Sequence, residues 1–386
     1  MKQKSREIHG GGLITDGALR PGVDRVVAYP LGSFVRAKNL FAGEANGLVY
    51  SRINNATVDR VERRIASIEG AEAGLATASG MAAITTIALY LANNGGHIVA
   101  SNRLYGGVFH LFREYLPKLG IFVTFVTNPH NPDEWERAIR PNTKFLALEV
   151  PSNPLIEIVD PRPIAEIAHR HKALFVVDGT LATPVLLRPL EHGADIVWHS
   201  LSKYFGDGEV IGGCILGKKT LLDDMRNTCF RDVGACMSPD NASIFLSHAE
   251  SLSSRVREHC SNAFQVAEFL VGHSKVQRVF HPAFGPRAKE NKKLMPNGFG
   301  CLMAFEVKGG QREAKKVLES LELFWHAANI GESKSLVIHP ATTTHGQMTA
   351  EELAAAGITQ GTLRLSIGRE DPLDLIYDLK QALKKI

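Results

Sequence analysis

The chain has 386 residues, more than a single hydrophobic core usually supports, which favours a large domain and a smaller one. Its apolar fraction of 44% is typical of a globular protein, and its net charge of only +4 argues against a nucleic-acid-binding or membrane-surface protein. No apolar stretch has the length of a membrane span, and the charged N-terminus predicts no secretory signal. The five cysteines are an odd number without metal-ligand spacing, so we expect them to be free thiols in a reducing cytoplasm.

The first part of the chain, residues 1–55, contains several glycines and prolines and shows no convincing hydrophobic period. A segment of that composition is difficult to pack within one subunit. We therefore predict an extended arm that becomes ordered by lying across a neighbouring copy of the chain.

Two helices are predicted next. Apolar residues at helical spacing indicate a helix over 57–70, with Thr57 as its N-cap and Gly70 as its stop. After it, Ser79, Gly80 and Met81 open a second helix that reaches residue 91. Small residues at a helix start expose backbone N–H groups to an anion, although a plain loop entering a helix would show the same residues.

From residue 97 onward, apolar runs alternate with helical patterns. Strands are predicted at 97–101, 121–126, 144–150 and 173–178, and helices at 108–119, 133–140 and 164–171. This repetition predicts an α/β fold with a mostly parallel sheet that helices cover on both faces. In such sheets ligands bind at the carboxyl ends of the strands.

Two charged residues stand at neighbouring strand ends. Asp178 ends one apolar run, and Lys203 follows the next run, just after Ser200 and Ser202. A dry lysine that condenses with an aldehyde, and a carboxylate that keeps a pyridine nitrogen protonated, are what a pyridoxal 5'-phosphate (PLP) enzyme requires. The two serines stand where hydroxyls could bind the phosphate. Taken alone, the lysine stretch favours a surface lysine at a strand end.

The glycines that follow, Gly212 and Gly213, are expected to let the backbone approach a bound molecule. A helix is then predicted over 220–231, and a long helical stretch over 242–271 is predicted to bridge two domains. The remaining elements are strands at 300–307 and 362–367 and helices at 313–321 and 372–384, which suggest a smaller α+β domain. The predicted domains are an intersubunit arm (1–55), a PLP-binding large domain (56–250) and a substrate-binding domain (251–386).

The order and spacing of the motifs resemble the PLP-dependent cysteine and methionine metabolism (transsulfuration) enzymes. This fold-type I group includes cystathionine γ-synthase, cystathionine lyases, methionine γ-lyase and the O-acyl-homoserine sulfhydrylases. The motifs that carry the resemblance are Tyr50-Ser51-Arg52, Ser79-Gly80-Met81, Tyr105-Gly106, Pro151-Ser152-Asn153-Pro154, Asp178, His199-Ser200-Leu201-Ser202-Lys203, His339-Pro340-Ala341-Thr342-Thr343-Thr344-His345 and Arg364-Leu365-Ser366-Ile367-Gly368.

The resemblance implies a role for each motif. Lys203 would carry PLP and move protons, and Tyr105 would stack on the ring and assist proton transfer. The implied cofactor-binding residues are Tyr50 and Arg52 from an adjacent subunit, Ser79, Gly80, Met81, Asn153, Asp178, Ser200, Ser202 and Lys203. Arg364 would bind the substrate carboxylate with its guanidinium fork.

Taken without the resemblance, several of these residues have simpler interpretations. Tyr105 fits a core tyrosine, Asn153 a turn residue between two prolines, and Arg364 a solvent-facing strand residue. Tyr50 and Arg52 fit surface residues ahead of a helix.

The resemblance also implies the reaction. The foremost prediction is γ-replacement or γ-elimination on an O-acyl-homoserine, with sulfide or a thiol as the incoming group. Asn329, expected beside Arg364 at the substrate carboxylate, and Gly107, expected to leave space for a bulky γ-group, both favour sulfhydrylases. The alternatives are a γ-lyase that releases 2-oxobutanoate and a PLP- or nucleotide-binding protein without turnover.

The same resemblance implies a homodimer with shared sites, which pairs into a homotetramer. Charge, the lengths of the apolar runs and ligand spacing predict no nucleic-acid, membrane or metal partner. His339 and His345 are interpreted as structural or entrance residues. The sequence departs from the family pattern shortly after Lys203. An acidic residue, Asp207, stands in place of the usual histidine, and a second one, Glu209, follows it. Their added negative charge leaves the substrate type open.

Overall fold

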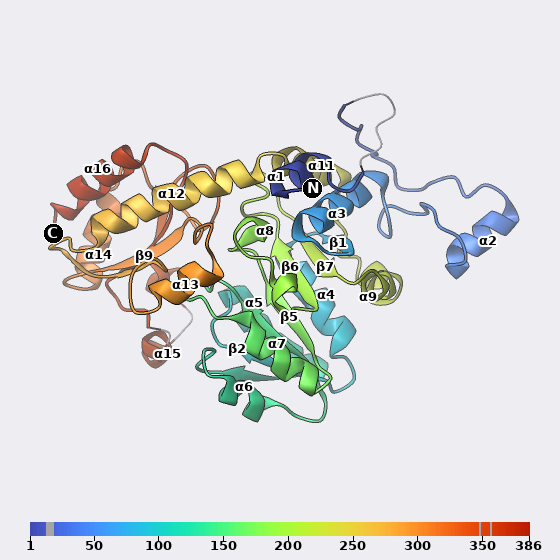
Figure 1. The fold of residues 1–386 in the computed structure, drawn as a ribbon, viewed down its shortest axis with the longest axis horizontal. Coiled ribbons are helices and arrows are strands. Elements are labelled where there is room, and N and C mark those ends of the chain that lie inside the picture. The colour runs from blue at the N-terminus through green and yellow to red at the C-terminus, as the bar shows by residue number, and fades with distance from the viewer. Residues whose placement is uncertain (13–18, 347–348, 356) are drawn as a thin grey trace.

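The computed structural model describes residues 1–12, 19–346, 349–355 and 357–386 of the chain. It contains a seven-stranded and a five-stranded sheet, built from consecutive stretches of the chain (Figure 1). Two sheets are what the length predicts. The exact domain limits at residues 55 and 250 remain a prediction.

The larger sheet has the order β1-β7-β6-β5-β4-β2-β3. Its strands are β1 (Ala73–Thr77), β2 (His97–Ser101), β3 (Phe122–Val126), β4 (Thr143–Glu149), β5 (Leu174–Asp178), β6 (Ile196–Ser200) and β7 (Gly213–Gly217). The five strands from β6 to β3 in this order are parallel. Strand β7 pairs antiparallel with both β6 and β1, so β1 runs in the direction of the five. The predicted mostly parallel α/β sheet is confirmed. Strand β1 was not predicted, because its short run consists mainly of alanine and glycine.

Helices cover both faces of this sheet, which explains why its strands are apolar on both sides. One face packs against α3 (Ala56–Glu69), α7 (Pro161–Arg170) and α11 (Pro239–Ala249), and the other against α4 (Gly80–Leu91), α5 (Gly106–His110) and α9 (Lys219–Met225). The alternation is visible within one strand, since Val177 faces the first set and Val176 the second. Shorter helices of this region are α6 (Pro132–Ala138), α8 (Thr183–Leu186) and α10 (Arg231–Val233).

The smaller sheet has the order β10-β11-β12-β9-β8. Its strands are β8 (Val276–Phe280), β9 (Leu302–Val307), β10 (Trp325–His326), β11 (Leu336–Ile338) and β12 (Thr362–Ser366), and its helices are α13 (Ala288–Leu294), α14 (Gln311–Ser320), α15 (Ala350–Ala355) and α16 (Pro372–Leu383). Helix α12 (Leu252–Leu270) runs from the larger sheet to the smaller one (Figure 1). The helical stretch predicted over 242–271 is divided between two helices: α11 ends at Ala249, and α12 starts three residues later, at Leu252.

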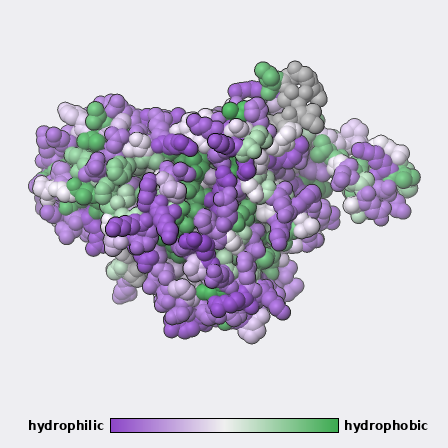
Figure 2. Space-filling view, in the orientation of Figure 1, coloured by the Kyte–Doolittle hydropathy of each residue, from purple (hydrophilic) through white to green (hydrophobic). Residues whose placement is uncertain are grey.

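The N-terminal segment contains two helices that the sequence did not reveal, α1 (Gln3–His9) and α2 (Phe34–Ala42). Helix α1 packs on its own subunit, where the Glu7 carboxylate accepts a hydrogen bond of 3.1 Å from the backbone N–H of Ser253. Helix α2 projects from the body (Figure 1), and hydrophobic residues are visible on its surface (Figure 2). Phe34 is 87% exposed and Phe41 66%.

Helix α3 begins one residue earlier than predicted. Its N-cap is Asn55 rather than Thr57, and the Asn55 side chain accepts hydrogen bonds from the N–H groups of Thr57 and Val58. Gly70 ends the helix as predicted, in a left-handed conformation with φ of 86°. Among the helices of the described residues, none combines the length and apolarity needed to cross a membrane.

Candidate active site

A cavity of about 190 Å³ opens where the carboxyl ends of β4, β5 and β6 meet the smaller sheet. It is lined by Ser79, Gly80, Met81, Tyr105, Val108, Glu149, Asn153, Asp178, Thr180, Leu181, Trp198, Ser200, Ser202, Lys203, Ala328, Asn329, Ile330, Thr344 and Arg364. The structure thus brings together every candidate site residue of the sequence analysis apart from Tyr50 and Arg52. We refer to this cavity as the Lys203 pocket.

Lys203 lies in the turn after β6, and its amine points at the smaller domain. Its Nζ donates a hydrogen bond of 2.8 Å to Oδ1 of Asn329. Burial, followed by the positive charge of Arg364, lowers the pKa of the Lys203 amine, although the carboxylates of Glu332 and Asp178 partly offset this. The amine is therefore neutral at a lower pH than that of an ordinary lysine, as a nucleophile requires.

Asp178 lies on β5 beside Glu149 on β4, and the two residues are aligned in the strand register. Burial raises the pKa of both carboxyl groups. For Asp178 the N–H of Thr180 opposes this rise with a hydrogen bond of 2.9 Å, whereas the charge of Asp178 raises the pKa of Glu149 further. Glu149 was missed by the sequence analysis, although it ends its apolar strand as Asp178 does.

The serines lie at the other end of the Lys203 pocket, near the N-terminus of α4. Oγ of Ser79 caps this helix by accepting a hydrogen bond of 3.0 Å from the N–H of Ala82. Gly80 allows this helix start to touch the end of β6, since a Cβ there would lie 2.6 Å from Cβ of Ser200. Oγ of Ser202 bonds the backbone N–H and carbonyl of Gly212, at 3.1 and 3.2 Å.

Gly212 and Gly213 pack closely against other parts of the protein. A Cβ on Gly213 would lie 2.3 Å from the carbonyl oxygen of Ser79, and one on Gly212 would lie 2.4 Å from the ring of Phe245. The expected approach of a bound molecule to these glycines stays a prediction.

Tyr105 stands at the start of α5, with its ring 46% exposed. Its backbone N–H donates a hydrogen bond to the Glu149 carboxylate, which fixes the loop after β2. The space at Gly107 is used by Tyr105 itself, because a Cβ there would lie 2.6 Å from Cε1 of that ring and 3.3 Å from the sulfur of Met81. Gly107 therefore seats the tyrosine ring, which corrects the expectation that it leaves space for a γ-group.

Arg364 on β12 is 3% exposed. Its Nη1 donates to Oδ1 of Asn153 at 3.1 Å and its Nη2 to the carbonyl oxygen of Asn329 at 3.2 Å, while its Nε has no partner among the described residues. Burial lowers the pKa of the guanidinium to about 10, and within the same part of the chain the groups that oppose this shift are Cys301 and Tyr105 rather than a carboxylate. A buried cation without a counter-charge is costly, so this arrangement suits an incoming carboxylate.

The side chain of Asn329 already has partners. Besides the contact with Lys203, its Nδ2 donates a hydrogen bond of 2.6 Å to Glu332, a residue that the sequence analysis did not single out. The expected contact of this amide with a substrate carboxylate remains a prediction.

Tyr50 and Arg52 lie elsewhere in the single chain. Arg52 lines a separate cavity of about 820 Å³ and donates a hydrogen bond to the carbonyl oxygen of Arg231. Tyr50 is 40% exposed, with the Arg52 guanidinium 5.5 Å from its ring centre. Both are accessible for the predicted role in a neighbouring subunit, which remains a prediction.

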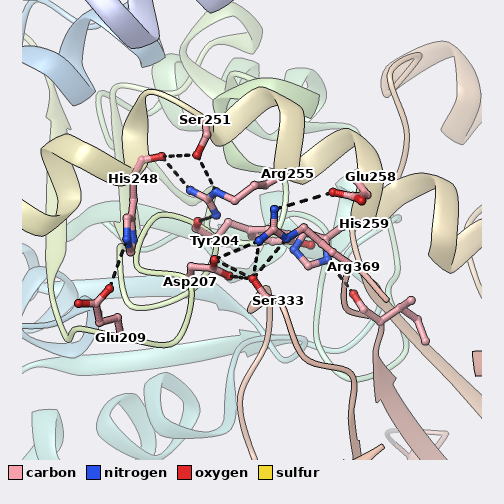
Figure 3. A network of polar contacts seen from close by, with 11 residues as sticks. Tyr204, Asp207, Glu209, His248, Ser251, Arg255, Glu258, His259, Ser333 and Arg369 are labelled. Carbon is pink, nitrogen blue, oxygen red and sulfur yellow. Dashed lines mark hydrogen bonds and ion pairs between the residues drawn. The ribbon is translucent and has the colours of Figure 1, made fainter. Parts of the chain in front are cut away.

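The two acids after Lys203 do not line the Lys203 pocket, as far as the described residues show. Glu209 is paired with His248 at 3.3 Å, and Asp207 accepts hydrogen bonds from the hydroxyl of Ser333 (Figure 3). His339 is hydrogen-bonded through both ring nitrogens, to Thr342 and to the carbonyl oxygen of Gln360. Burial and Arg364 lower the pKa of His345 to about 4.

The residues of the Lys203 pocket fit PLP. An amine with a lowered pKa faces the pocket together with a strand-end carboxylate and the N-terminus of a helix flanked by serines, which are the groups that bind an aldehyde, a pyridine nitrogen and a phosphate. The unpartnered Nε of Arg364 is an orphaned donor suited to a substrate carboxylate.

Known proteins agree with this fit. The chain is 39% identical to an L-methionine gamma-lyase of Porphyromonas gingivalis, over 99% of this chain and 97% of the relative. It is also 39% identical to an O-acetyl-L-homoserine sulfhydrylase of Corynebacterium glutamicum (98% and 95%) and to an O-succinylhomoserine sulfhydrylase of Pseudomonas aeruginosa (89% and 85%).

A similar solved structure is that of a Campylobacter jejuni protein provisionally named as an O-acetylhomoserine (thiol)-lyase. It has a TM-score of 0.95 and 35% identity, covers both chains fully, and carries a pyridoxyl-lysine 5'-monophosphate. The model of the family described as Cys/Met metabolism PLP-dependent enzyme matches residues 15–384. The chain therefore belongs to the Cys/Met metabolism family of PLP-dependent enzymes, and it has the fold-type I architecture of that family.

Proposed function

We propose that this enzyme performs γ-replacement on an O-acyl-homoserine, with sulfide or a thiol as the incoming nucleophile. The observation that carries the proposal is the joint placement of the Lys203 amine, the Asp178 carboxylate and the uncompensated Arg364 guanidinium in one pocket. An amino acid whose carboxylate binds Arg364 presents its Cα and its γ-substituent to the same pocket.

Bound at Lys203, PLP supplies an electron sink that acidifies the substrate's Cα–H bond. The Asp178 carboxylate would hold the protonated ring nitrogen, and Ser79, Ser200 and Ser202 would hold the phosphate together with the N-terminus of α4. Arg364 orients the α-carboxylate with its guanidinium fork, and Asn153 holds both that fork and the ring oxygen.

The chain's own groups then move the protons. The Lys203 amine would take the proton from Cα, give it up to the bound cofactor, and so return to its neutral form before it takes a second proton from Cβ. Its lowered pKa suits a base that works near neutral pH. The phenol of Tyr105, held by Glu149 through the backbone, protonates the oxygen of the leaving acyl group.

The second candidate function is γ-elimination, as the name of the gamma-lyase relative suggests. Identity does not separate the two, since a lyase and two sulfhydrylases are each 39% identical to this chain. We favour replacement because Asn329 occupies the position where the family's sulfhydrylases carry asparagine, and because its amide is part of the Lys203 pocket.

The deciding experiment compares O-acetylhomoserine, O-succinylhomoserine, cystathionine, homocysteine and methionine, with and without sulfide. We expect the homoserine esters to react faster than methionine, and added sulfide to divert the product from 2-oxobutanoate to homocysteine. Methionine turned over faster than every ester, with no thioether or homocysteine formed, would contradict replacement and establish the lyase.

A PLP- or nucleotide-binding protein without turnover is tested separately. We expect a visible absorbance band that borohydride abolishes, after which peptide mass mapping places the pyridoxyl group on Lys203. A protein that binds PLP there but converts none of the five amino acids would support the non-catalytic alternative.

We also infer that the active unit is a homodimer, paired into a homotetramer, in the cytoplasm. The inference of shared sites is supported by the position of Arg52 outside the pocket of its own chain and by the exposed apolar face of α2. The cytoplasmic location is supported by five cysteines that are all free.

A further inference from the structure

The three segments that supply Lys203, Asn329 and Arg364 meet a second time, outside the Lys203 pocket. Their second meeting point consists of Asp207, Ser333 and Arg369, which we call the distal clasp (Figure 3). Each residue of the distal clasp follows its partner in the pocket by about one helical turn of sequence. The same three segments are therefore joined at two levels.

The inner level lies in the pocket. Nζ of Lys203 donates to Oδ1 of Asn329 at 2.8 Å, and Nη2 of Arg364 donates to the carbonyl oxygen of Asn329 at 3.2 Å. Asn329 is thus the centre of this level. Because Asn329 bonds both side chains, it limits how far the Lys203 amine can lie from the Arg364 guanidinium.

The outer level repeats this arrangement with Ser333 at the centre. The Ser333 hydroxyl donates to the Asp207 carboxylate, at 2.8 and 2.9 Å to its two oxygens, and accepts from Nη2 and Nε of Arg369 at 2.7 and 3.3 Å. The backbone N–H of Arg369 donates to the carbonyl oxygen of Ser333 at 2.8 Å. The donor and both acceptor positions of the hydroxyl are thereby used.

The distal clasp is charged and partly shielded from water. Nη2 of Arg369 lies 3.6 Å from Asp207, whose side chain is 18% exposed. The other end of the guanidinium, Nη1, lies 3.8 Å from Glu258 on α12, the helix that connects the two sheets. The distal clasp therefore attaches the lysine turn and the segment of Asn329 to a rigid element.

The contact between the segments continues between the two levels. Gly208 has φ of 80°, and a Cβ there would lie 2.6 Å from Oε2 of Glu332, the same oxygen that accepts from Asn329. Asp207 itself has a φ of 49°, in the left-handed region that is unfavourable for most residues. Its conformation is compatible with a backbone held in place by the contacts of its carboxylate.

We propose that Asp207, Ser333 and Arg369 are positioning residues, which hold the turn of Lys203 in register with the segments of Asn329 and Arg364. By this means they set the distance between the cofactor lysine and the substrate-carboxylate site. The inference rests on the proposed roles of Lys203 and Arg364. It assigns to Asp207 a mechanical role outside the pocket rather than an effect on the charge of the substrate.

The test uses the PLP-loaded enzyme and the variants Asp207→Asn, Ser333→Ala and Arg369→Met, with Arg369→Lys as the conservative variant. A matched control is Glu136→Gln, which removes an exposed carboxylate paired with Arg170 and His171 far from the pocket. We expect the three clasp variants to lower kcat/KM by about 10- to 100-fold, mainly through a higher KM for the amino-acid substrate. Arg369→Lys should recover part of the loss, and the control should match the wild type.

Two further measurements separate positioning from simple loss of stability. The double variant Asp207→Asn, Arg369→Met should be no worse than the poorer single variant, because both residues act through Ser333. In cofactor-free protein, the pH at which the Lys203 amine becomes acylated should shift in the clasp variants. If Asp207→Asn or Arg369→Met fails to fold, the test of positioning rests on Ser333→Ala, because this substitution removes only one hydroxyl.

The inference is overturned if the clasp variants, normalised to the amount of bound PLP, keep wild-type kcat and KM and the wild-type acylation profile, even with a lower thermal midpoint. Failure of the proposed function would look different. If the proposed function is wrong, the wild type itself shows no turnover or no pyridoxyl group on Lys203.

Discussion

Glu149 and Asp178 end adjacent parallel strands in register, so two carboxyl groups border the Lys203 pocket side by side. Lys203 and His199 favour the charge on Asp178, whereas the charge of Asp178 raises the pKa of Glu149 well above its usual range. Of the two carboxyl groups, Glu149 therefore keeps a proton more readily than Asp178 does.

The raised pKa of Glu149 favours its neutral form, which predicts that Glu149→Gln is well tolerated. Glutamine is uncharged and its Oε1 can still accept the hydrogen bond from the N–H of Tyr105. Glu149→Ala leaves that N–H without its acceptor and should lower kcat/KM by an amount equivalent to about 1–3 kcal/mol. Steady-state kinetics check this, with Asp178→Asn as the comparison that we expect to lose PLP. Equal damage from Gln and Ala would show that the charge of Glu149 is needed.

The lowered pKa of Lys203 predicts its reactivity in cofactor-free protein. Because its amine is neutral at a lower pH, an acylating reagent should modify Lys203 at a lower pH than it modifies the exposed lysines. The Arg364→Met variant removes a positive charge that lowers this pKa, so the acylation profile of Lys203 should move to higher pH. Mass spectrometry of peptides labelled across a pH series measures both effects. An unchanged profile in Arg364→Met would remove the electrostatic explanation.

Shared sites predict complementation between inactive chains. Lys203→Ala removes the cofactor lysine, and Arg52→Ala removes the guanidinium that we expect to reach a neighbouring subunit. When the two variants are unfolded and refolded together, hybrid dimers contain one site with both residues intact, so part of the activity should return. Either variant refolded alone is the control. No recovery, or a fully active monomer in ultracentrifugation, would argue against an intersubunit role for Arg52.

His259 on α12 predicts how stability depends on pH. Its Nδ1 donates to the carbonyl oxygen of Ile367 at 2.7 Å, so in the neutral ring the buried Nε2 carries no proton, and it has no partner in the part of the chain that the structure describes. Burial lowers the pKa of the ring from 6.5 to about 4; Arg255 and Arg369 add to this, and Asp207 opposes it. Because the unfolded chain binds a proton at higher pH, the contribution of His259 to stability is present above pH 6.5 and is lost as the pH falls toward 4.

The corresponding experiment compares the wild type with His259→Asn, whose amide can donate to the same carbonyl oxygen but does not titrate. Between pH 7 and 5 the wild type should lose roughly 2 kcal/mol more of its free energy of unfolding than the variant. Urea unfolding at each pH measures the difference, since other acid-sensitive groups are common to both proteins. Parallel curves would show that His259 is protonated in the folded state.

The amino-acid sequence by itself determined the fold class, the family and the strand ends that carry chemistry. Regular alternation of apolar runs and helical periods is a local property, so it predicted the parallel sheet and placed Asp178 and Lys203 at neighbouring strand ends. The end of a helix was also predictable where a single residue terminates it, as Gly70 does for α3. Local signals were weaker where the composition was mixed, which is why α1, α2 and β1 were not predicted.

Only the tertiary structure decided which distant residues share a contact. The raised pKa of Glu149 depends in part on its neighbour Asp178 on another strand, and the need for glycine at position 107 depends on the nearby ring of Tyr105. The distal clasp joins Asp207 to Ser333, which lies 126 positions further along the chain, and a hydrophobic period in the sequence cannot predict such a pairing. Sequence patterns report which face of an element is buried, whereas hydrogen bonds and ion pairs depend on distances of a few ångströms that exist only once both sheets have packed around α12.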